Sequence, residues 1–199
     1  MINTGKFTTL NQTAQIAGVM PSDNNIEFIG VRKTKEVLWL QNGTNHYFSD
    51  LPLQYFQLLK SAYLKDHKAI RFLSSITECL KRQIELYTYY MYGDVDTTPD
   101  ISEGRLSPSE NFRDTKNCPS LLWNSKNINI ATHVLTPRQL VIVDLIGKDL
   151  PDKAIAATLG ISHKTLDFHK CNLYKAVGVN TKTALLKMSI QYKVISFSC

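Results

Sequence analysis

The spacing of apolar residues near the start of the chain is typical of β-strands. Residues 26–31 and 37–41 are rich in side chains that favour strands, and the dipeptide Asn42-Gly43 follows the second run. Asn-Gly is the pair that type I′ hairpin turns prefer, because both positions need positive φ. The pattern predicts a hairpin of residues 37–41 and 46–49. The first 25 residues are polar and rich in turn formers, with one short helix expected around residues 10–17.

From Pro52 onward the apolar positions recur every three or four residues, which predicts helices. Proline is favoured in a first helical turn, and one apolar face follows it, made of Leu53, Phe56, Leu59 and Tyr63. A second helix is predicted over residues 68–92. Four tyrosines gather at its end: Tyr87, Tyr89, Tyr90 and Tyr92. Such a stripe can line a ligand pocket, but it more often packs in a core or a subunit contact, which is the interpretation we favour.

Residues 93–133 lose this periodicity because glycine, proline, asparagine and aspartate recur throughout. The segment is predicted to be a linker or an irregular packed loop, with the apolar residues 121–123 docked on one of its neighbours. Asp94, Asp96 and Asp100 raise the question of a metal loop. Val95 and Pro99 interrupt these aspartates and no glutamate stands at the spacing of an EF-hand, so a solvated loop is the favoured interpretation.

Residues 135–147 carry the start signals and the apolar stripe of a helix. Thr136 is a favoured N-cap residue, Pro137 suits the first helical position, and Gln139 completes a capping box. The stripe that we expect to be buried is formed by Ile142, Val143 and Ile146.

Two further helices follow, separated by a short turn. Pro151-Asp152 opens the first of them, Gly160 ends it with the positive φ that a C-cap favours, and Ser162 caps the next. The inward positions are Ile155, Ala156, Leu159, Leu166, His169 in part, Leu173 and Val177, with Ile161 filling the turn. Two helices joined in this way form a helix-turn-helix, whose second helix lies in the major groove of DNA. A fourth helix is predicted over residues 181–192, with Met188 and Tyr192 exposed.

These elements predict a chain that is mainly α. Residues 1–93 are expected to form an N-terminal α+β domain with a small β-hairpin, residues 94–133 an irregular linker, and residues 134–199 a C-terminal four-helix helix-turn-helix domain. Because each C-terminal helix has its own start signal and apolar stripe, residues 135–199 are expected to fold alone.

Charge and composition point toward a polyanionic partner and away from an enzyme. Residues 135–199 hold nine Lys/Arg and four Asp/Glu, so +5 of the net +6 lies in the last third. The sequence has neither a signal peptide nor an apolar run long enough for a membrane span, and its four cysteines are scattered, which suits the cytoplasm. No nucleophile elbow, phosphate loop or HExxH motif is present, so we expect no enzyme activity, cofactor or metal.

The C-terminal third resembles the LuxR-type helix-turn-helix. The motif is carried by Leu135, Thr136, Arg138, Lys153, Ile155, Ala156, Leu159, Ile161, Ser162, Thr165, His169, Gly178 and Val179. A sigma-factor-like helix-turn-helix is the nearest alternative, but Thr165-Leu166-x-x-His169 followed by Val177-Gly178-Val179 favours the LuxR type. The resemblance implies a bacterial, DNA-binding transcription regulator that binds double-stranded DNA as a homodimer. RNA polymerase is a further candidate partner.

The resemblance also implies which side chains meet DNA. Asp167, Phe168 and Cys171 would face base edges on the outer side of the third helix. An aspartate there can accept from cytosine N4 at a cost in affinity, and a phenylalanine can contact a thymine methyl. Residues expected to hold the phosphate backbone are His163, Lys164, Thr165, Lys170 and Lys175, with His169 as a packing or phosphate residue.

Several positions depart from the family pattern. Gln139, Val141 and Ala154 stand where the family usually carries glutamate, and Asp149 replaces a turn glycine. Ala176 replaces a lysine, so one phosphate contact is missing and weaker DNA binding is expected.

Two functions therefore remain open. In the first, the protein is a dimeric, sequence-specific regulator, which the domain charge and intact caps favour. In the second, it is an interaction or dimerisation protein with a degenerate helix-turn-helix, which Asp167 and Ala176 favour. The N-terminal part lacks the paired acidic residues and alternating βα pattern of a receiver domain and is not recognisable as an autoinducer-binding domain, so no effector is indicated.

Overall fold

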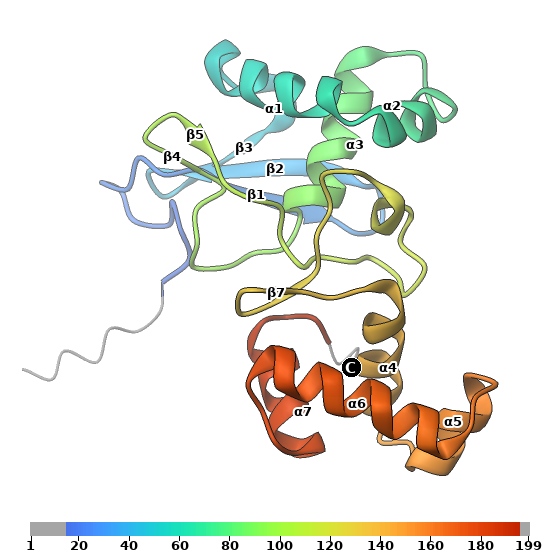
Figure 1. Cartoon of the computed structure of the whole chain (residues 1–199). Coiled ribbons are helices and arrows are strands. Elements are labelled where there is room, and N and C mark those ends of the chain that lie inside the picture. The colour runs from blue at the N-terminus through green and yellow to red at the C-terminus, as the bar shows by residue number, and fades with distance from the viewer. Residues whose placement is uncertain (1–14, 196–199) are drawn as a thin grey trace, which may run out of the picture.

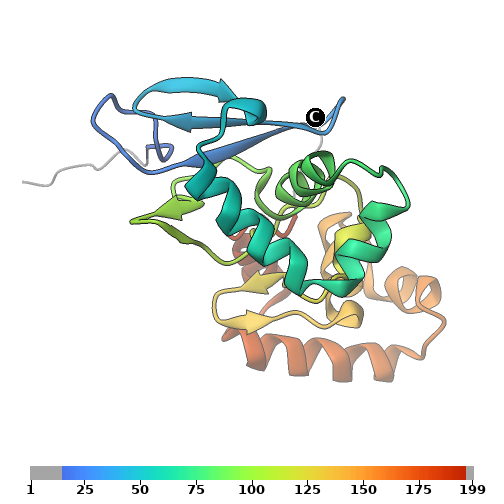
Figure 2. The ribbon, with the colours of Figure 1, turned by 90° about the horizontal axis from the view of Figure 1, so that it is seen from above.

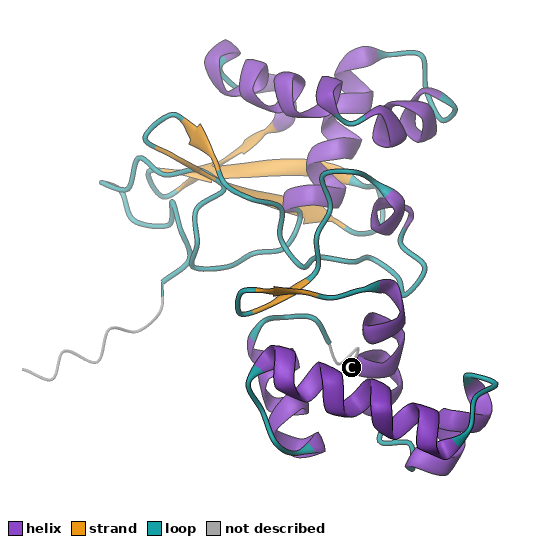
Figure 3. Cartoon of the chain, viewed as in Figure 1, coloured by secondary structure: helices purple, strands orange, loops and turns teal. Residues whose placement is uncertain are grey.

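The computed structural model describes residues 15–195, which form two stacked units (Figure 1). The N-terminal unit combines a small antiparallel sheet with three helices, and the C-terminal unit is helical apart from one short hairpin (Figure 3). The predicted class, mainly α with a small N-terminal sheet and a four-helix C-terminal domain, is confirmed. Most of the short helix expected at residues 10–17 lies outside the described residues, and residues 15–17 are not helical.

The sheet has three strands in the order β1 (Glu27–Val31), β2 (Glu36–Gln41) and β3 (Thr44–Tyr47). The predicted hairpin is confirmed as β2 and β3, although β3 starts earlier and residues 48–50 form a short 3-10 helix, η1 (Phe48–Asp50). Asn42 and Gly43 have φ values of 51° and 74°, as the type I′ turn requires.

Three helices follow: α1 (Leu53–Lys65), α2 (His67–Ser74) and α3 (Leu80–Tyr92). The prediction of one helix over residues 68–92 is therefore wrong. The chain leaves the helix between Ser74 and Leu80. There the Gln83 side chain donates to the Thr77 carbonyl and the Cys79 N–H donates to the Thr77 hydroxyl, so these polar groups are satisfied without helical hydrogen bonds. Ile76 is exposed in this break, and α2 packs on α3. Leu53, expected on the buried face of α1, is 71% exposed.

The N-terminal core is built around α3, which packs on β1 and β2 (Figure 2). Tyr87, Tyr89, Tyr90 and Tyr92 are each at most 3% exposed, which confirms the core interpretation of the tyrosine stripe. Trp123 docks here as expected, stacked on Tyr87 with ring centroids 5.6 Å apart, whereas Leu122 points to solvent.

The segment between the units is irregular but packed. Its elements are β4 (Ile101–Ser102), β5 (Arg105–Leu106), the 3-10 helix η2 (Pro119–Leu122), β6 (Asn129–Ile130) and β7 (His133–Val134). It contributes Ile101, Phe112 and Trp123 to the N-terminal core, and Ile128 and Ile130 to the C-terminal core. The same stretch of chain therefore takes part in both cores.

The C-terminal unit contains the four predicted helices: α4 (Pro137–Gly147), α5 (Asp152–Thr158), α6 (His163–Val177) and α7 (Lys182–Gln191). The capping box of Thr136 and Gln139 is present in both directions. Met188, expected to be exposed on α7, packs partly against the C-terminal core, because Ser189 and Leu185 turn that side of the helix inward. Tyr192 is 37% exposed. No helix within residues 15–195 has the length and apolar character needed to cross a membrane.

Arg113 joins the linking segment to the C-terminal unit. Its guanidinium donates to both carboxylate oxygens of Asp144, at 2.9 and 2.7 Å, and to the Val194 carbonyl at 2.6 Å. The side chains of Arg113 and Asp144 are only 9% and 14% exposed. A bidentate pair with so little solvent contact is much stronger than a surface ion pair, and removing one partner leaves the other buried and unpaired.

We therefore expect Arg113→Met to lower the free energy of unfolding by about 2–3 kcal/mol. Urea denaturation at pH 7 measures this loss, and the double variant with Asp144→Asn should recover part of it. Arg82→Met is the matched control, because the Arg82–Glu85 pair at 2.7 Å lies within the N-terminal unit and is more exposed. That control should lose less than about 1 kcal/mol. Equal losses in the two arginine variants would contradict the assignment.

Candidate nucleic-acid interface

The turn between α5 and α6 holds the two helices at a fixed angle. The Ile161 N–H donates to the Ala156 carbonyl at 3.1 Å, and Gly160 adopts φ +63°. Ser162 then caps α6 by accepting from the Thr165 N–H at 3.1 Å. These local bonds explain why the predicted turn residues suffice to build a helix-turn-helix. Figures 1 and 2 both place α6 on the side of the C-terminal unit that faces away from the three-stranded sheet.

The two faces of α6 differ sharply in burial. Leu166 and Leu173 are fully buried and Val177 is 8% exposed, which anchors the helix in the C-terminal core as predicted. The opposite face carries exposed side chains at positions three or four apart: His163, Lys164, Asp167, Phe168, Cys171 and Lys175. Phe168 is 65% exposed. A large aromatic side chain open to this extent is available for contact with a partner.

Charged side chains link α5 and α6 at the edge of this face. Lys170 Nζ lies 2.5 Å from Asp152 Oδ2 and 3.7 Å from Asp167 Oδ1. Asp167 Oδ2 in turn lies 3.1 Å from His163 Nδ1. Burial alone would lower the pKa of Lys170, but the hydrogen bond to Asp152 and the nearby carboxylates outweigh it and raise that pKa. Lys170 is thus positively charged and joins α6 to α5 through its ion pair with Asp152.

The nine predicted site residues divide into three groups. The exposed face of α6 carries six of them together, as described above. Thr165 is exposed at the start of the helix, with its hydroxyl 2.8 Å from that of Ser162. His169 is half-buried beside the Phe168 ring, and Lys170, whose side chain is 13% exposed, is directed toward Asp152. Geometry therefore does not support the expected phosphate contact of Lys170, because its ammonium is engaged within the protein.

Two residues that organise this site were missed by sequence reasoning. Asp152 holds Lys170 from 18 positions away, and Arg138 donates from α4 to the Leu159 carbonyl at 3.4 Å. Both contacts join different helices, so no helical spacing connects them. The available signals were the place of Arg138 in the family motif and the position of Asp152 in the first turn of α5, but neither indicates the contact that the residue makes.

Comparison with known proteins identifies the C-terminal unit. Residues 133–189 match the family described as "Bacterial regulatory proteins, luxR family", which confirms the resemblance. The chain is 37% identical over 62 residues to the transcriptional regulatory protein MctR of Rhizobium johnstonii, covering 31% of this chain and 29% of that protein. It is 33% identical over 64 residues to the oxygen regulatory protein NreC of Staphylococcus aureus, covering 32% and 30%. The chain thus spans about three tenths of the length of these relatives. No solved structure was found to match it.

Proposed function

We propose that this chain, whose residues 133–189 form a helix-turn-helix domain of the luxR family, is a sequence-specific transcriptional regulator that acts by binding double-stranded DNA. The observation that carries the proposal is α6 itself, a capped helix with its apolar face in the core and a polar face open to solvent. Such a helix fits the major groove, where each base pair presents a distinct pattern of hydrogen-bonding groups.

Within this proposal some side chains on the outer face of α6 contact the DNA phosphates and position the helix, and others contact base edges and recognise the sequence. Lys164 and Lys175 are exposed and suit phosphate contacts, together with His163 and Thr165 at the helix start. Phe168 and Cys171 offer apolar contact to base edges. Asp167, whose side chain is 53% exposed, is available to accept from cytosine N4, and the nearby Lys170 reduces its charge toward phosphates. Lys170 acts as a positioning residue through Asp152 rather than as a phosphate ligand.

A pair of such domains is part of the proposal. One recognition helix contacts few base pairs, and dimers compensate by binding two half-sites about 10 bp apart. The end of α7 supports a contact between copies, because Ile190 and Tyr192 are 40% and 37% exposed there. RNA polymerase is the further partner that a transcription regulator would engage from DNA.

The second candidate function is an interaction protein with a degenerate helix-turn-helix. The exposed Phe168 ring favours it as an apolar contact for a protein partner, and the pairing of Lys170 with Asp152 favours it because less positive charge is directed at DNA. The +5 charge of residues 135–199 favours the first function.

Substitutions on α6 distinguish the two candidates. Lys164→Ala should weaken binding to all sequences by about 3–10-fold and lower the log–log salt slope by roughly one unit, because one phosphate contact is lost. Asp167→Ala should strengthen binding to arbitrary DNA and relax the preference at one base pair by about 1–3 kcal/mol. A binding array on genomic fragments, at two salt concentrations, measures both effects.

The control for these variants is Lys68→Ala, which removes an exposed lysine of α2 in the N-terminal unit. It should leave the affinity and the salt slope unchanged. If neither Lys164→Ala nor Asp167→Ala alters DNA binding relative to this control, α6 does not enter the groove and the interaction function replaces the first.

A further inference from the structure

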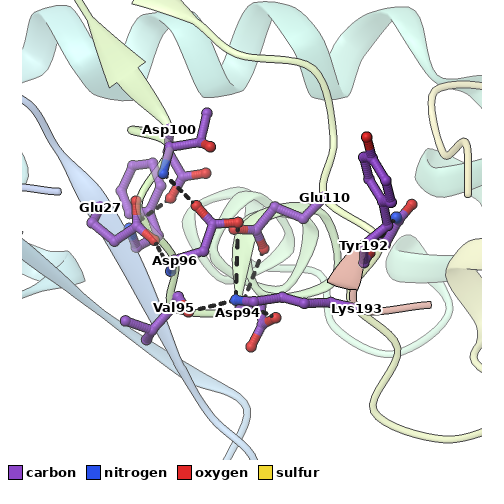
Figure 4. Close-up of polar contacts among 11 residues, drawn as sticks. Glu27, Asp94, Val95, Asp96, Asp100, Glu110, Tyr192 and Lys193 are labelled. Carbon is purple, nitrogen blue, oxygen red and sulfur yellow. Dashed lines mark hydrogen bonds and ion pairs between the residues drawn. The ribbon is translucent and has the colours of Figure 1, made fainter. Parts of the chain in front are cut away.

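Five carboxylates converge where the two units meet. Glu27 comes from β1, Asp94, Asp96 and Asp100 from the loop after α3, and Glu110 from the loop after β5 (Figure 4). Carboxylate oxygens of Glu27, Asp96 and Glu110 all lie within 4.8 Å of one another. Asp100 is 2% exposed, so the prediction of a solvated loop is wrong for this aspartate, whereas the side chains of Asp94 and Asp96 stay 31% and 26% exposed. The sheet and the loop bury Glu27 and Asp100 fully and the other three in part.

Backbone N–H groups fix one oxygen of three of these side chains, and in two of them the second oxygen has no partner in the described chain. The Asp96 N–H donates to Glu27 Oε1 at 2.6 Å, and the Asp94 N–H to Glu110 Oε2 at 2.9 Å. The Thr98 N–H donates to Asp96 Oδ1 at 2.6 Å. Glu27 Oε2 and Glu110 Oε1 are buried and have no hydrogen-bond partner within residues 15–195. A carboxylate that is held by one oxygen, with its second oxygen buried and unpartnered in a cluster of carboxylates, is arranged for a ligand among them.

We propose that Glu27, Asp96 and Glu110 bind a calcium ion. Carboxylate oxygens are the donors that hard divalent cations take. Ca²⁺ takes six to eight oxygen ligands in a flexible geometry, whereas Mg²⁺ requires a near-octahedral geometry, keeps several waters and is usually held by one or two carboxylates. A group of three protein carboxylates therefore favours the larger ion. A cleft lined by Asp94, Asp96 and Glu110 opens on the same point and gives water access to the remaining coordination positions.

A side chain of the C-terminal unit already brings positive charge to this cluster. Lys193 Nζ lies 2.9 Å from Asp94 Oδ2 and 3.9 Å from Asp96 Oδ2, and it donates to the Val95 carbonyl at 2.6 Å (Figure 4). The lysine therefore competes with calcium for Asp96. Since it lies beyond α7, calcium binding is coupled to the contact between the two units.

Burial and mutual repulsion shift the pKa values of these carboxyl groups. Burial, together with the neighbouring carboxylates, raises the pKa of Glu27 to about 8 and that of Glu110 to about 9, although each accepts a backbone hydrogen bond that lowers it. Burial and the charges of Glu110 and Glu27 likewise raise the pKa of Asp100. Lys193 and the buried Lys126 are the cations that oppose these shifts.

Thermal unfolding of the full chain at pH 8 tests the proposal. With a dissociation constant on the order of 10⁻⁴ M, 2 mM CaCl₂ should raise the Tm by roughly 4–7 °C over NaCl of equal ionic strength. Glu27→Gln and Glu110→Gln should remove this shift. Both should fold in NaCl, because glutamine matches the shape of a protonated glutamate. Glu103→Gln, an exposed change on the β4–β5 turn, should keep the full shift.

A second measurement does not depend on the folding of the glutamine variants. In calorimetric titration with CaCl₂, Lys193→Met should bind roughly 3–10-fold more tightly than the original chain, because a competing cation is gone. The proposal is overturned if CaCl₂ gives no specific Tm shift, or if the shift survives in both glutamine variants. An equal shift with 2 mM MgCl₂ would overturn the assignment of calcium. If Lys193→Met bound calcium with unchanged or weaker affinity, Lys193 would not compete with calcium for Asp96.

Discussion

Replacement of Asp66 by alanine is expected to lower the free energy of unfolding by about 3–5 kcal/mol. Asp66 is 0% exposed between α1 and α2. Its carboxylate accepts from the Ala69 N–H at 3.0 Å, which caps α2, and from the Asn124 and Ser125 N–H groups at 3.2 and 2.7 Å. Alanine would leave three backbone donors without their acceptor in the interior, and would release the linking segment from α2.

The same contacts predict how stability responds to acid. Burial alone would raise the pKa of Asp66, but the hydrogen bonds from Ala69, Ser125 and Asn124 outweigh it and lower that pKa below its usual 3.8. A carboxyl with a lowered folded-state pKa stabilises the protein above its usual pKa, and this contribution is lost as the pH falls through the folded value. Asp66→Ala should therefore be less sensitive to acid than the original chain below pH of about 4.

Urea denaturation at pH 7 and at pH 3 measures both effects. Asp50→Ala is the matched control, because Asp50 is exposed and accepts only from the Ser49 hydroxyl in the described chain. It should change the stability by no more than about 0.5 kcal/mol at pH 7. If Asp66→Ala lowered the free energy of unfolding by no more than this control does, other groups would have to satisfy the three backbone donors.

The second large effect concerns the boundary of the C-terminal unit. A fragment of residues 127–199 is expected to fold, whereas residues 135–199 alone should be largely unfolded. Ile128 and Ile130 are 4% and 0% exposed in the C-terminal core, and the Leu135 N–H donates to the Ile128 carbonyl at 2.8 Å. Losing two buried isoleucines costs about 3–6 kcal/mol, comparable to the whole stability of a domain of this size. This replaces the expectation that residues 135–199 suffice.

Circular dichroism and amide chemical-shift dispersion of the two fragments measure this difference. The double variant Ile128→Ala, Ile130→Ala in the longer fragment is the control for chain length. This variant should be nearly as unstable as the fragment of residues 135–199. Two fragments of equal stability would mean that β6 and β7 add nothing to the core.

Sequence reasoning succeeded where local signals determine the structure. The capping box at Thr136 and the positive φ at Asn42 and Gly160 depend on neighbouring residues, so the helix-turn-helix and the hairpin could be predicted. It failed at the break between α2 and α3. Apolar residues continue there at helical spacing, and the alternative partners of Thr77 are visible only in three dimensions.

The charged clusters could not be predicted for the same reason. Glu27 and Asp96 are 69 positions apart, and although the aspartates around Asp96 raised the question of a metal loop, nothing in that segment indicates Glu27 as a neighbour. Only the fold places the loop after α3 against β1, where an aspartate-rich stretch becomes a buried cluster. Likewise, the outer position of Lys170 on α6 follows from its spacing, but its bond to Asp152 depends on how α5 crosses α6.

Both tryptophans lie in the N-terminal unit, so the intrinsic tryptophan fluorescence of the chain reports on that unit. Trp39, stacked on His46, and Trp123, stacked on Tyr87, are both buried in the N-terminal core. Residues 135–199 contain no tryptophan. Tryptophan emission therefore monitors the unit remote from α6. A change in that emission when a partner binds at α6 would be a direct signal of communication from one unit to the other.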